Sequence, residues 1–456
     1  MLTVRSLTRR RAAVGFAAAV ATSCALLLSA CAPGSTSKAD PPSSKAAGTD
    51  VAAKPVTLTL LVTTGVDQTL FGALGTLFHA AHPNVTVTVK NQDYNTLTTN
   101  IAHILSGSDV PDLVRVPQFG NLIKDNLLAA LDGYAKAYGW DSWSQSQFAS
   151  TRVGTDGRQR GSGSLYGAGP GFGLTGIYYN AALARRIGMT SPPATLAQFE
   201  QLLAKAKAAG LQPIMVNGKD GGTVYPLQNL QMDYAGDAQP LQRWNYAQPG
   251  ANINTAATVH AAATLQQWSR AGYLPSDVNG IDQTQAPVQF TKGTGVFFPS
   301  GNWQAPGLDK AGAGKFGFFL FPPVAAGQQT WAMTAPDTLA IPAKSSHAET
   351  AAAFLNFIQT DPKAREDAVK LGGIVPAGPS DAAVPATPAG SAVGATVSAF
   401  QALLKNNGLV SFMADATASI NVNTLLPQTQ LLLGDKTSPK AYAAKVQADY
   451  RDDLQH

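Results

Sequence analysis

An alternation of strand-like and helix-like segments near the start of the chain constrains the fold more than any other feature. Three strand-like runs alternate with two runs of apolar residues at helical spacing: strands at 56–62, 85–89 and 112–116, helices at 70–79 and 97–105. The order strand, helix, strand, helix, strand predicts right-handed crossovers and a mainly parallel sheet. This part of the chain is therefore expected to be an α/β unit.

Polar side chains follow each of these predicted strands. Ligands of parallel sheets bind beyond the carboxyl ends of the strands, so these positions are candidate contacts. Simple solvation is the alternative for a polar loop residue. The candidates are Thr64 and Asp67 after the first strand, Tyr94 and Asn95 after the second, and Arg115 and Gln118 after the third.

The N-terminus has a basic start, an apolar middle and a cysteine at its end. Four arginines lie within the first 11 residues, the run 12–28 is almost wholly apolar or small, and Ser29 and Ala30 precede Cys31. This order resembles a bacterial lipoprotein signal peptide over residues 1–30, cut so that Cys31 carries lipid. A plain secretory signal or a membrane span are the alternatives, but a span needs about 20 strongly apolar residues.

Removing residues 1–30 changes the charge and cysteine content. The formal charge falls from +5 to +1, because 29 basic and 28 acidic residues remain. No basic patch for nucleic acid follows from such a balance.

Cys24 is removed with the predicted signal peptide, so a lipidated Cys31 leaves no disulfide. Residues 31–54 are rich in Pro, Ser, Ala, Gly and Lys and predict a flexible linker.

Four segments of the remaining chain are distinctive in their joint order. They are the run from Ile177-Tyr178-Tyr179-Asn180 to Pro213, the segment Gly107–Asp112, the segment Gly295–Trp303, and Leu339–Lys344 followed by Ala351–Ile358. Together they resemble the extracellular solute-binding proteins, of the family 1 type, of carbohydrate ABC importers. The resemblance extends from about Val56 to the C-terminus.

The resemblance implies an α/β fold of the periplasmic-binding-protein-like type II, with two α/β lobes, a hinge and a ligand cleft between the lobes. Matching segments place one lobe at 55–166 plus 339–374 and the other at 170–334 plus 377–456. The crossings fall near 167–169, 334–339 and 372–376, where glycine and proline clusters suit a hinge. Ordinary loops are the alternative for these clusters.

Aromatic side chains are the groups that a sugar ring requires, since its C–H face packs on an indole or a phenol. Trp303 lies in the segment where the resemblance implies a sugar-stacking tryptophan. The same comparison makes Tyr225 and Trp331 candidate walls of the site. Core packing is the alternative for each of them.

The family often has an acidic residue near the end of the third strand, where it accepts hydrogen bonds from sugar hydroxyls. Pro117 and Gln118 stand there in this chain, which leaves the sugar undefined. Asp337 at the second crossing is the candidate substitute acceptor.

Other site signatures lack their expected context. A G-x-G-x-x-G match at 171–176 has no strand before it, no helix after it and no acid about 20 residues on, as a dinucleotide site requires. Three histidines at 79, 82 and 103 lack the acid pattern of a zinc site. No G-x-S-x-G motif occurs. We therefore expect no cofactor, no metal site and no catalytic residue.

The resemblance implies a monomeric receptor, anchored by lipid to the extracytoplasmic face of the cell membrane, that binds a sugar or oligosaccharide and delivers it to the transmembrane subunits of an ABC permease. Two alternatives stay open. A surface-anchored glycan-active enzyme would need two carboxylates about 5–10 Å apart across its pocket. A solute sensor would work without a permease.

Overall fold

The computed structural model describes residues 48–116 and 118–455. These described residues form one compact unit. Cys31, the predicted signal peptide and most of the predicted linker lie outside the described residues. Within the described ranges, none of the helices combines the length and the apolar character that a membrane crossing needs.

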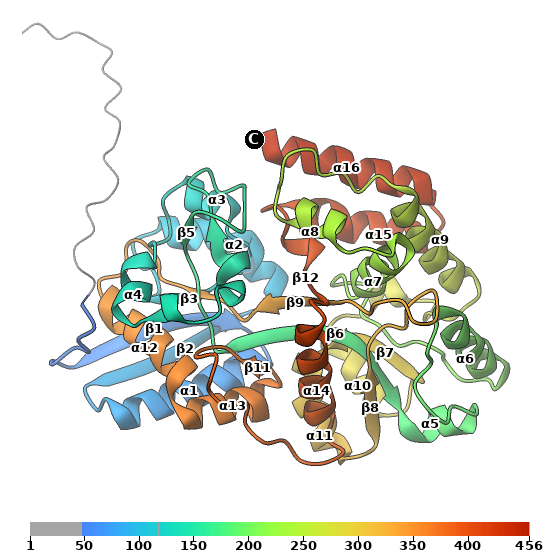
Figure 1. Cartoon of the computed structure of the whole chain (residues 1–456), viewed down its shortest axis with the longest axis horizontal. Coiled ribbons are helices and arrows are strands. Elements are labelled where there is room, and N and C mark those ends of the chain that lie inside the picture. The colour runs from blue at the N-terminus through green and yellow to red at the C-terminus, as the bar shows by residue number, and fades with distance from the viewer. Residues whose placement is uncertain (1–47, 117, 456) are drawn as a thin grey trace, which may run out of the picture. The chain divides into compact units, whose positions relative to one another are not determined.

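A four-stranded sheet in the order β10-β3-β1-β2 forms the centre of what we call the first lobe (Figure 1). Strand β1 (Val56–Thr63) pairs in parallel with β2 (Val85–Gln92) and with β3 (Leu113–Arg115). Strand β10 (Leu339–Ala340) adds an antiparallel edge from a distant part of the chain. The three strands predicted from the first 116 residues therefore form the parallel part of the sheet.

Helices cover this sheet through apolar faces. Leu70, Leu74 and Phe78 recur at spacings of four residues on α1 and are fully buried, because residues four apart share one face of a helix. Asp93 caps α2 by accepting hydrogen bonds from the Asn95 and Thr96 amides. The elements of this lobe are α1 (Val66–Ala81), α2 (Tyr94–Ser106), α3 (Gly120–Lys124), α4 (Asp132–Ala137), η1 (Trp140–Ser142), η2 (Gln145–Thr151), β4 (Arg152–Val153), β5 (Ser164–Leu165), α12 (Ala348–Thr360) and α13 (Pro362–Gly372).

A six-stranded sheet forms the centre of the second lobe. Its longest strand, β6 (Gly171–Asn180), pairs antiparallel with four others, whereas β9 and β12 run parallel to each other. The remaining strands are β7 (Phe297–Gly301), β8 (Phe316–Phe319), β9 (Ala332–Pro336), β11 (Val375–Pro376) and β12 (Leu409–Ser411).

Ten α-helices and several short turns of helix surround this second sheet among the described residues. They are α5 (Ala181–Arg186), α6 (Leu196–Ala208), α7 (Val224–Ala235), α8 (Gln239–Asn245), α9 (Ala256–Arg270), η3 (Val278–Gly280), α10 (Gln285–Thr291), η4 (Asn302–Gln304), α11 (Ala305–Gly312), α14 (Ala392–Lys405), η5 (Met413–Asp415), η6 (Ile420–Leu425), α15 (Leu426–Leu433) and α16 (Pro439–Gln455).

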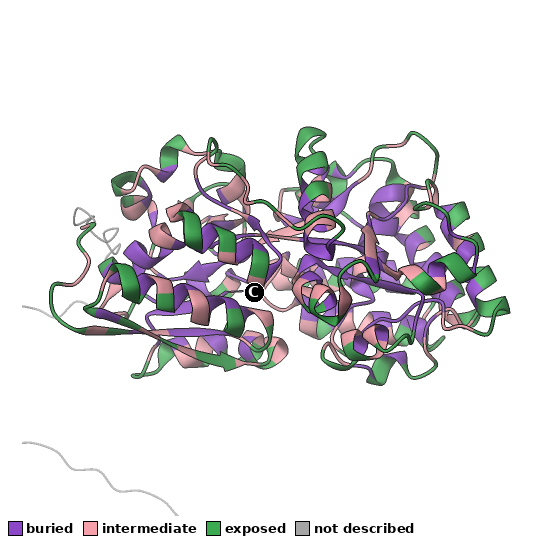
Figure 2. Cartoon of the chain, turned by 90° about the horizontal axis from the view of Figure 1, so that it is seen from below, coloured by how far each residue is buried: buried purple, intermediate pink, exposed green. Residues whose placement is uncertain are grey.

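Buried residues gather around the two sheets (Figure 2). In the first lobe, Trp140 is fully buried, and its indole N–H donates to Asn356 Oδ1 at 2.9 Å. In the second lobe, the indole N–H of the buried Trp268 donates to Glu200 Oε1 at 2.9 Å. These two tryptophans therefore combine apolar burial with a satisfied polar atom.

The three segments predicted to join the lobes lie side by side. The Asp337 amide donates to Gly171 O, and the Ala377 amide donates to Pro170 O. A β-carbon on Gly169 would lie 1.9 Å from Asp337 O, and one on Gly171 would lie 2.2 Å from Val375 O. Glycine is required at both positions because two backbones approach closely there.

Candidate functional site

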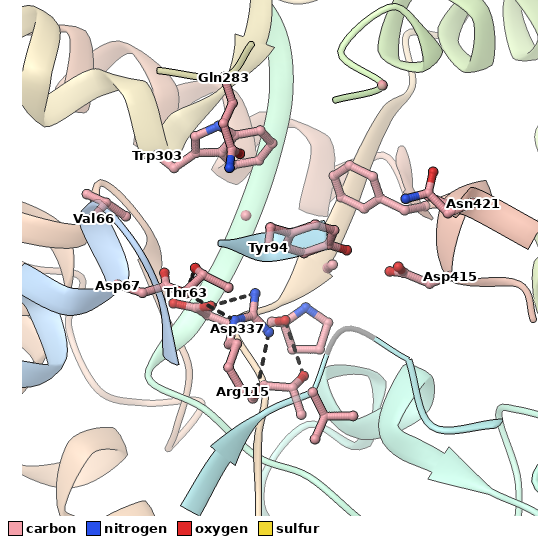
Figure 3. Close-up of a pocket in the computed structure, with 18 of the residues that line it drawn as sticks. Thr63, Val66, Asp67, Tyr94, Arg115, Gln283, Trp303, Asp337, Asp415 and Asn421 are labelled. Atoms are coloured by element: carbon pink, nitrogen blue, oxygen red, sulfur yellow. Dashed lines mark hydrogen bonds and ion pairs between the residues drawn. The ribbon is translucent and has the colours of Figure 1, made fainter. Parts of the chain in front are cut away.

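A cavity of about 530 Å³ lies where strands of both sheets end (Figure 3). The first lobe contributes residues that follow β1, β2 and β3, and the second contributes residues that follow β7, β9 and β12. Residues near the N-terminus of α7 and before α10 also line it. The carboxyl ends of the parallel strands thus meet at one site, as expected for α/β sheets.

Seven of the ten residues expected to contact a ligand line this cavity: Thr64, Asp67, Tyr94, Arg115, Tyr225, Trp303 and Asp337. They come from separate strands and loops of both lobes. The structure therefore brings together most of the candidate residues, although they span 274 positions of the chain.

The other three candidates do not line the cavity. Trp331 is 6% exposed and packs in the apolar core of the second lobe, so it is not a cavity wall. Gln118 is buried, and its amide donates to Ala414 O at 2.9 Å. Asn95 donates from Nδ2 to Asp220 Oδ1 at 3.4 Å. Gln118 and Asn95 therefore contact cavity-lining residues of the second lobe.

Three aromatic rings of the second lobe form a continuous wall. The Tyr225 ring meets the Trp303 ring edge-to-face, with centroids 5.8 Å apart, and meets the Phe412 ring edge-to-face at 6.0 Å. Tyr94, the first residue of α2, comes from the first lobe and lies near the middle of the cavity in Figure 3. Such rings offer faces on which the C–H groups of a flat ligand can pack.

A buried amide fixes the position of Trp303. The side chain of the neighbouring Asn302 accepts a hydrogen bond from the Leu174 amide at 2.8 Å and donates to Gly373 O at 2.8 Å. These bonds tie the turn after β7 to β6 and to the segment after α13. A β-carbon on Gly301 would lie 2.0 Å from the Trp303 ring, so the indole occupies the space that glycine leaves.

The Gly301→Ala variant should therefore be less stable by about 1–3 kcal/mol, since the added methyl group overpacks a filled space. Gly307→Ala in the neighbouring helix α11 is the matched control, because a β-carbon there meets no atom within 4 Å. Urea unfolding of both variants measures the difference. Equal unfolding free energies for the two variants would contradict the packing of the indole against Gly301.

A cluster of charges centres on Arg115. Arg115 pairs with Asp337 at 2.7 Å and with Asp67 at 3.4 Å, and also donates to Thr338 O at 3.2 Å (Figure 3). The Thr63 hydroxyl donates to Asp67. Burial raises the pKa of Asp337 above its ordinary value, although Arg115 acts in the opposite direction. Arg115 thus forms ion pairs with two carboxylates of the protein itself.

Asp415 is a separate carboxylate that faces the cavity (Figure 3). Its main-chain oxygen accepts a hydrogen bond from Arg160, but its carboxylate receives none from another described residue. Burial raises the pKa of Asp415 to about 6, while Arg160 and Arg115 act in the opposite direction. The carboxylate is therefore available to a ligand.

Buried amide side chains hold the segment that carries Phe412 and Asp415. Ser411 O accepts from Gln228 Nε2 at 2.8 Å and from Asn245 Nδ2 at 2.5 Å. Gln228 Oε1 in turn accepts from the Met413 amide at 2.9 Å. The backbone on both sides of Phe412 is thus fixed by side chains of α7 and α8.

Further hydrogen bonds connect the two lobes around the cavity. Gln283 Nε2 donates to Asp93 Oδ2 of the other lobe at 3.0 Å, and within the second lobe the Gln283 amide donates to Asp220 Oδ2 at 2.6 Å. Arg158 donates to Gln455 O at 3.2 Å. Together with the bonds from Asn95 and Gln118, these contacts hold residues of opposite lobes against each other.

Several lining residues were not among the predictions, notably Phe412, Asp415, Asp220 and Gln283. Asp220 stands in the turn-rich run Asn217–Gly222, and such a run directly before the candidate Tyr225 was a usable signal. Phe412 and Asp415 follow β12, which has only three residues. Among the described residues, no group of three or more His, Cys, Asp or Glu side chains is arranged to hold a metal ion.

Comparison with known proteins supplies two findings. Residues 73–420 match the family described as bacterial extracellular solute-binding protein. No match was found among curated proteins.

Solved structures give a match over most of the chain. A chitin oligosaccharide binding protein has a TM-score of 0.71 at 19% identity, covering 88% of this chain and 100% of its own. RafE in complex with raffinose has a TM-score of 0.68 at 19% identity, covering 87% and 99%. The GacH receptor of Streptomyces glaucescens GLA.O, solved unliganded and with acarbose, has a TM-score of 0.71 at 19% identity, covering 88% and 98%. These likenesses confirm the predicted fold class.

Proposed function

The chain belongs to the bacterial extracellular solute-binding proteins, and we propose that it binds a sugar or oligosaccharide as the substrate-binding component of an ABC importer. The observation that carries this proposal is the wall of Trp303, Tyr225 and Phe412 rings facing a cavity that polar side chains also line. A sugar needs both kinds of surface, since its C–H faces pack on aromatic rings and its hydroxyls bond to polar groups. The similar structures, whose names mention chitin oligosaccharide, raffinose and acarbose, support the same class of ligand.

The proposed mechanism is closure of the two lobes on the ligand. The lobes in this proposal are residues 55–166 plus 339–374 and residues 170–334 plus 377–456. Aromatic groups of the second lobe and the polar groups after β1, β2 and β3 of the first would contact the ligand together. A ligand that contacts both lobes binds the closed state more tightly than the open state, so it shifts the population toward closure.

The cellular arrangement is part of the proposal. Lipid on Cys31 would anchor the receptor on the extracytoplasmic face of the cell membrane, and residues 31–54 would act as the flexible connection. The order of residues in the first 31 positions supports this. The closed monomer would then dock on the transmembrane subunits of a permease and release its sugar to them.

A thermal-shift screen tests the proposed function. A sugar present at 100 times its Kd should stabilise the folded protein by about 2.7 kcal/mol, which corresponds to a rise in Tm of about 3 °C for a chain of this size. Mono- and oligosaccharides form the test panel, with amino acids and short peptides as the control panel. Calorimetry then measures the affinity of each sugar that raises Tm.

Two results would contradict the proposal. Stabilisation by amino acids or peptides with no response to any sugar would assign the cavity to another class of solute. Release of shortened glycans during incubation would support the alternative of a glycan-active enzyme.

A further inference from the structure

The cavity is acidic. Its charged lining residues are five aspartates and two arginines, namely Asp67, Asp93, Asp220, Asp337, Asp415, Arg115 and Arg160. No lysine or histidine is among the described residues that line it. The formal charge of the lining is therefore −3, whereas a neutral sugar requires no such excess.

Both arginines are already occupied by groups of the protein. Arg115 contacts Asp67, Asp337 and Thr338 O. Arg160 is 6% exposed and donates to the main-chain oxygen of Asp415. The charge of Arg160 is opposed by that of Asp415. A carboxylate, sulfate or phosphate on a ligand would therefore still meet a lining with excess negative charge.

Three of the five carboxylates are also occupied. Asp67 and Asp337 pair with Arg115, while Asp93 caps α2 and accepts from Gln283. Asp220 accepts from the Gln283 amide and from Asn95, both uncharged donors, so its negative charge is not neutralised. Asp415 differs from all four, because no described residue donates a hydrogen bond to its carboxylate.

Aromatic rings accompany Asp415 in the cavity. Figure 3 shows the phenol end of Tyr94 and the Asp415 carboxylate facing the same part of the cavity. Phe412 precedes Asp415 by three residues and also lines the cavity. A carboxylate and a phenol oxygen that face the same space can both accept hydrogen bonds from an ammonium group.

We propose that the preferred ligand is an amino sugar, or an oligosaccharide of amino sugars, whose free ammonium group is bound by Asp415 beside Tyr94. This proposal rests on the proposed sugar-binding function and names its substrate class. A hydroxyl or an N-acetyl group at the same position would supply no positive charge. A uronic acid would be repelled.

Titration of Asp415 provides a second readout. The charged and titratable groups that act on it or respond to it are Arg160, Arg115, Tyr94 and Tyr225. Since burial raises the pKa of Asp415 to about 6, part of the carboxyl is protonated at pH 6 before the ligand binds. A bound ammonium lowers that pKa, so binding of an amino sugar should release protons at pH 6, and its affinity should fall below pH 6.

Calorimetry with matched sugars tests the proposal on the unmodified folded protein. The set consists of glucose, glucosamine, N-acetylglucosamine and glucuronic acid, together with cellobiose, chitobiose and its fully deacetylated form. The amine should bind at least tenfold more tightly than the matched hydroxyl sugar, and glucuronic acid should show no binding. The tenfold preference should shrink as the salt concentration is raised, because the attraction is between charges.

Two variants test whether Asp415 causes the preference for the amine. Asp415→Asn should reduce the ratio of amine to hydroxyl affinity to about one. Asp435→Asn, which removes an exposed carboxylate paired with Arg270 far from the lining, should leave that ratio unchanged. If Asp415→Asn does not fold, the salt dependence and the proton release of the unmodified protein test the proposal instead. Absence of both effects would overturn it.

The outcomes separate this proposal from the one on which it rests. A hydroxyl sugar that binds as tightly as its amine overturns the amino-sugar proposal and leaves the sugar-binding function intact. Absence of binding by every member of the set, with a thermal shift from a different class of solute, overturns both.

Discussion

Replacement of Trp303 by alanine should lower the affinity for the sugar ligand by about 100-fold or more. A buried aromatic contact in the middle of a binding site contributes about 2–4 kcal/mol, and 2.8 kcal/mol corresponds to 100-fold. We expect the loss of binding free energy in Trp303→Ala to lie in the upper part of this range, because the substitution also removes the edge-to-face partner of the Tyr225 ring. Calorimetry at a temperature well below Tm of the variant measures the effect.

Two further variants make this experiment selective. Trp303→Phe keeps an aromatic face and should lose less affinity than Trp303→Ala. Trp143→Ala removes a half-buried tryptophan that packs on Trp140 and Phe148 in the first lobe, away from the cavity, and should leave the affinity of the folded protein unchanged. Full retention of affinity by Trp303→Ala would exclude the indole as a ligand contact.

Replacement of Asp233 by asparagine should raise the free energy of unfolding by about 2–4 kcal/mol at pH 7. Asp233 lies on α7, is 4% exposed, and one of its carboxylate oxygens has no hydrogen-bond partner among the described residues. Burial raises its pKa to about 8. A carboxyl that stays protonated in the folded protein but ionises in the unfolded chain destabilises the fold.

The pH dependence of this effect has a definite sign. The ordinary pKa of aspartate in an unfolded chain is about 4. Below that pH, Asp233 is protonated in both the folded and the unfolded state and does not lower the free energy of unfolding. From about pH 4 to 8 the free energy of unfolding falls as pH rises, by at most about 1.4 kcal/mol per pH unit. Above pH 8 the loss is complete and constant.

Urea unfolding at pH 4.5, 7 and 8.5 measures this curve. The advantage of Asp233→Asn over the natural protein should be smallest at pH 4.5 and largest at pH 8.5. Asp237→Asn, which changes an exposed carboxylate next to α7, is the matched control. An advantage that is equal at all three pH values would mean that Asp233 is not protonated in the folded state.

The fold was predictable where strands are long and sequential. Strands β1 and β2 each have eight residues, so their β-branched composition is visible in the sequence, and the helices between them set the parallel order. Once that order is known, the residues after each strand are expected at one edge of the sheet. Thr64, Asp67, Tyr94 and Arg115 were found in this way.

The cavity residues of β12 could not be predicted by the same reasoning. This strand has three residues, too few for a periodic pattern, and it pairs with β9 from more than 70 positions earlier. Phe412 and Asp415 therefore looked like ordinary loop residues. Their place in the lining becomes visible only when β12 joins the sheet, with its carboxyl end at the cavity.

Trp331 shows the opposite error. It stands one residue before β9, and the family resemblance made it a candidate wall because of its place before the second crossing. Side chains alternate between the two sides of an extended chain, and the side that Trp331 faces is the apolar core. When a strand is short, the type of a residue and its neighbours in the sequence do not determine which side of the sheet its side chain faces.

The hydrogen bonds that connect the lobes around the cavity have a consequence for the timing of transport. Bonds such as Gln283 to Asp93 and Gln118 to Ala414 join the lobes whatever molecule is enclosed. A ligand enclosed between the lobes can leave only after these hydrogen bonds break. The bonds therefore slow the dissociation of every ligand by a similar factor. Sugars that contact both lobes more strongly should stabilise the closed state further and therefore dissociate more slowly.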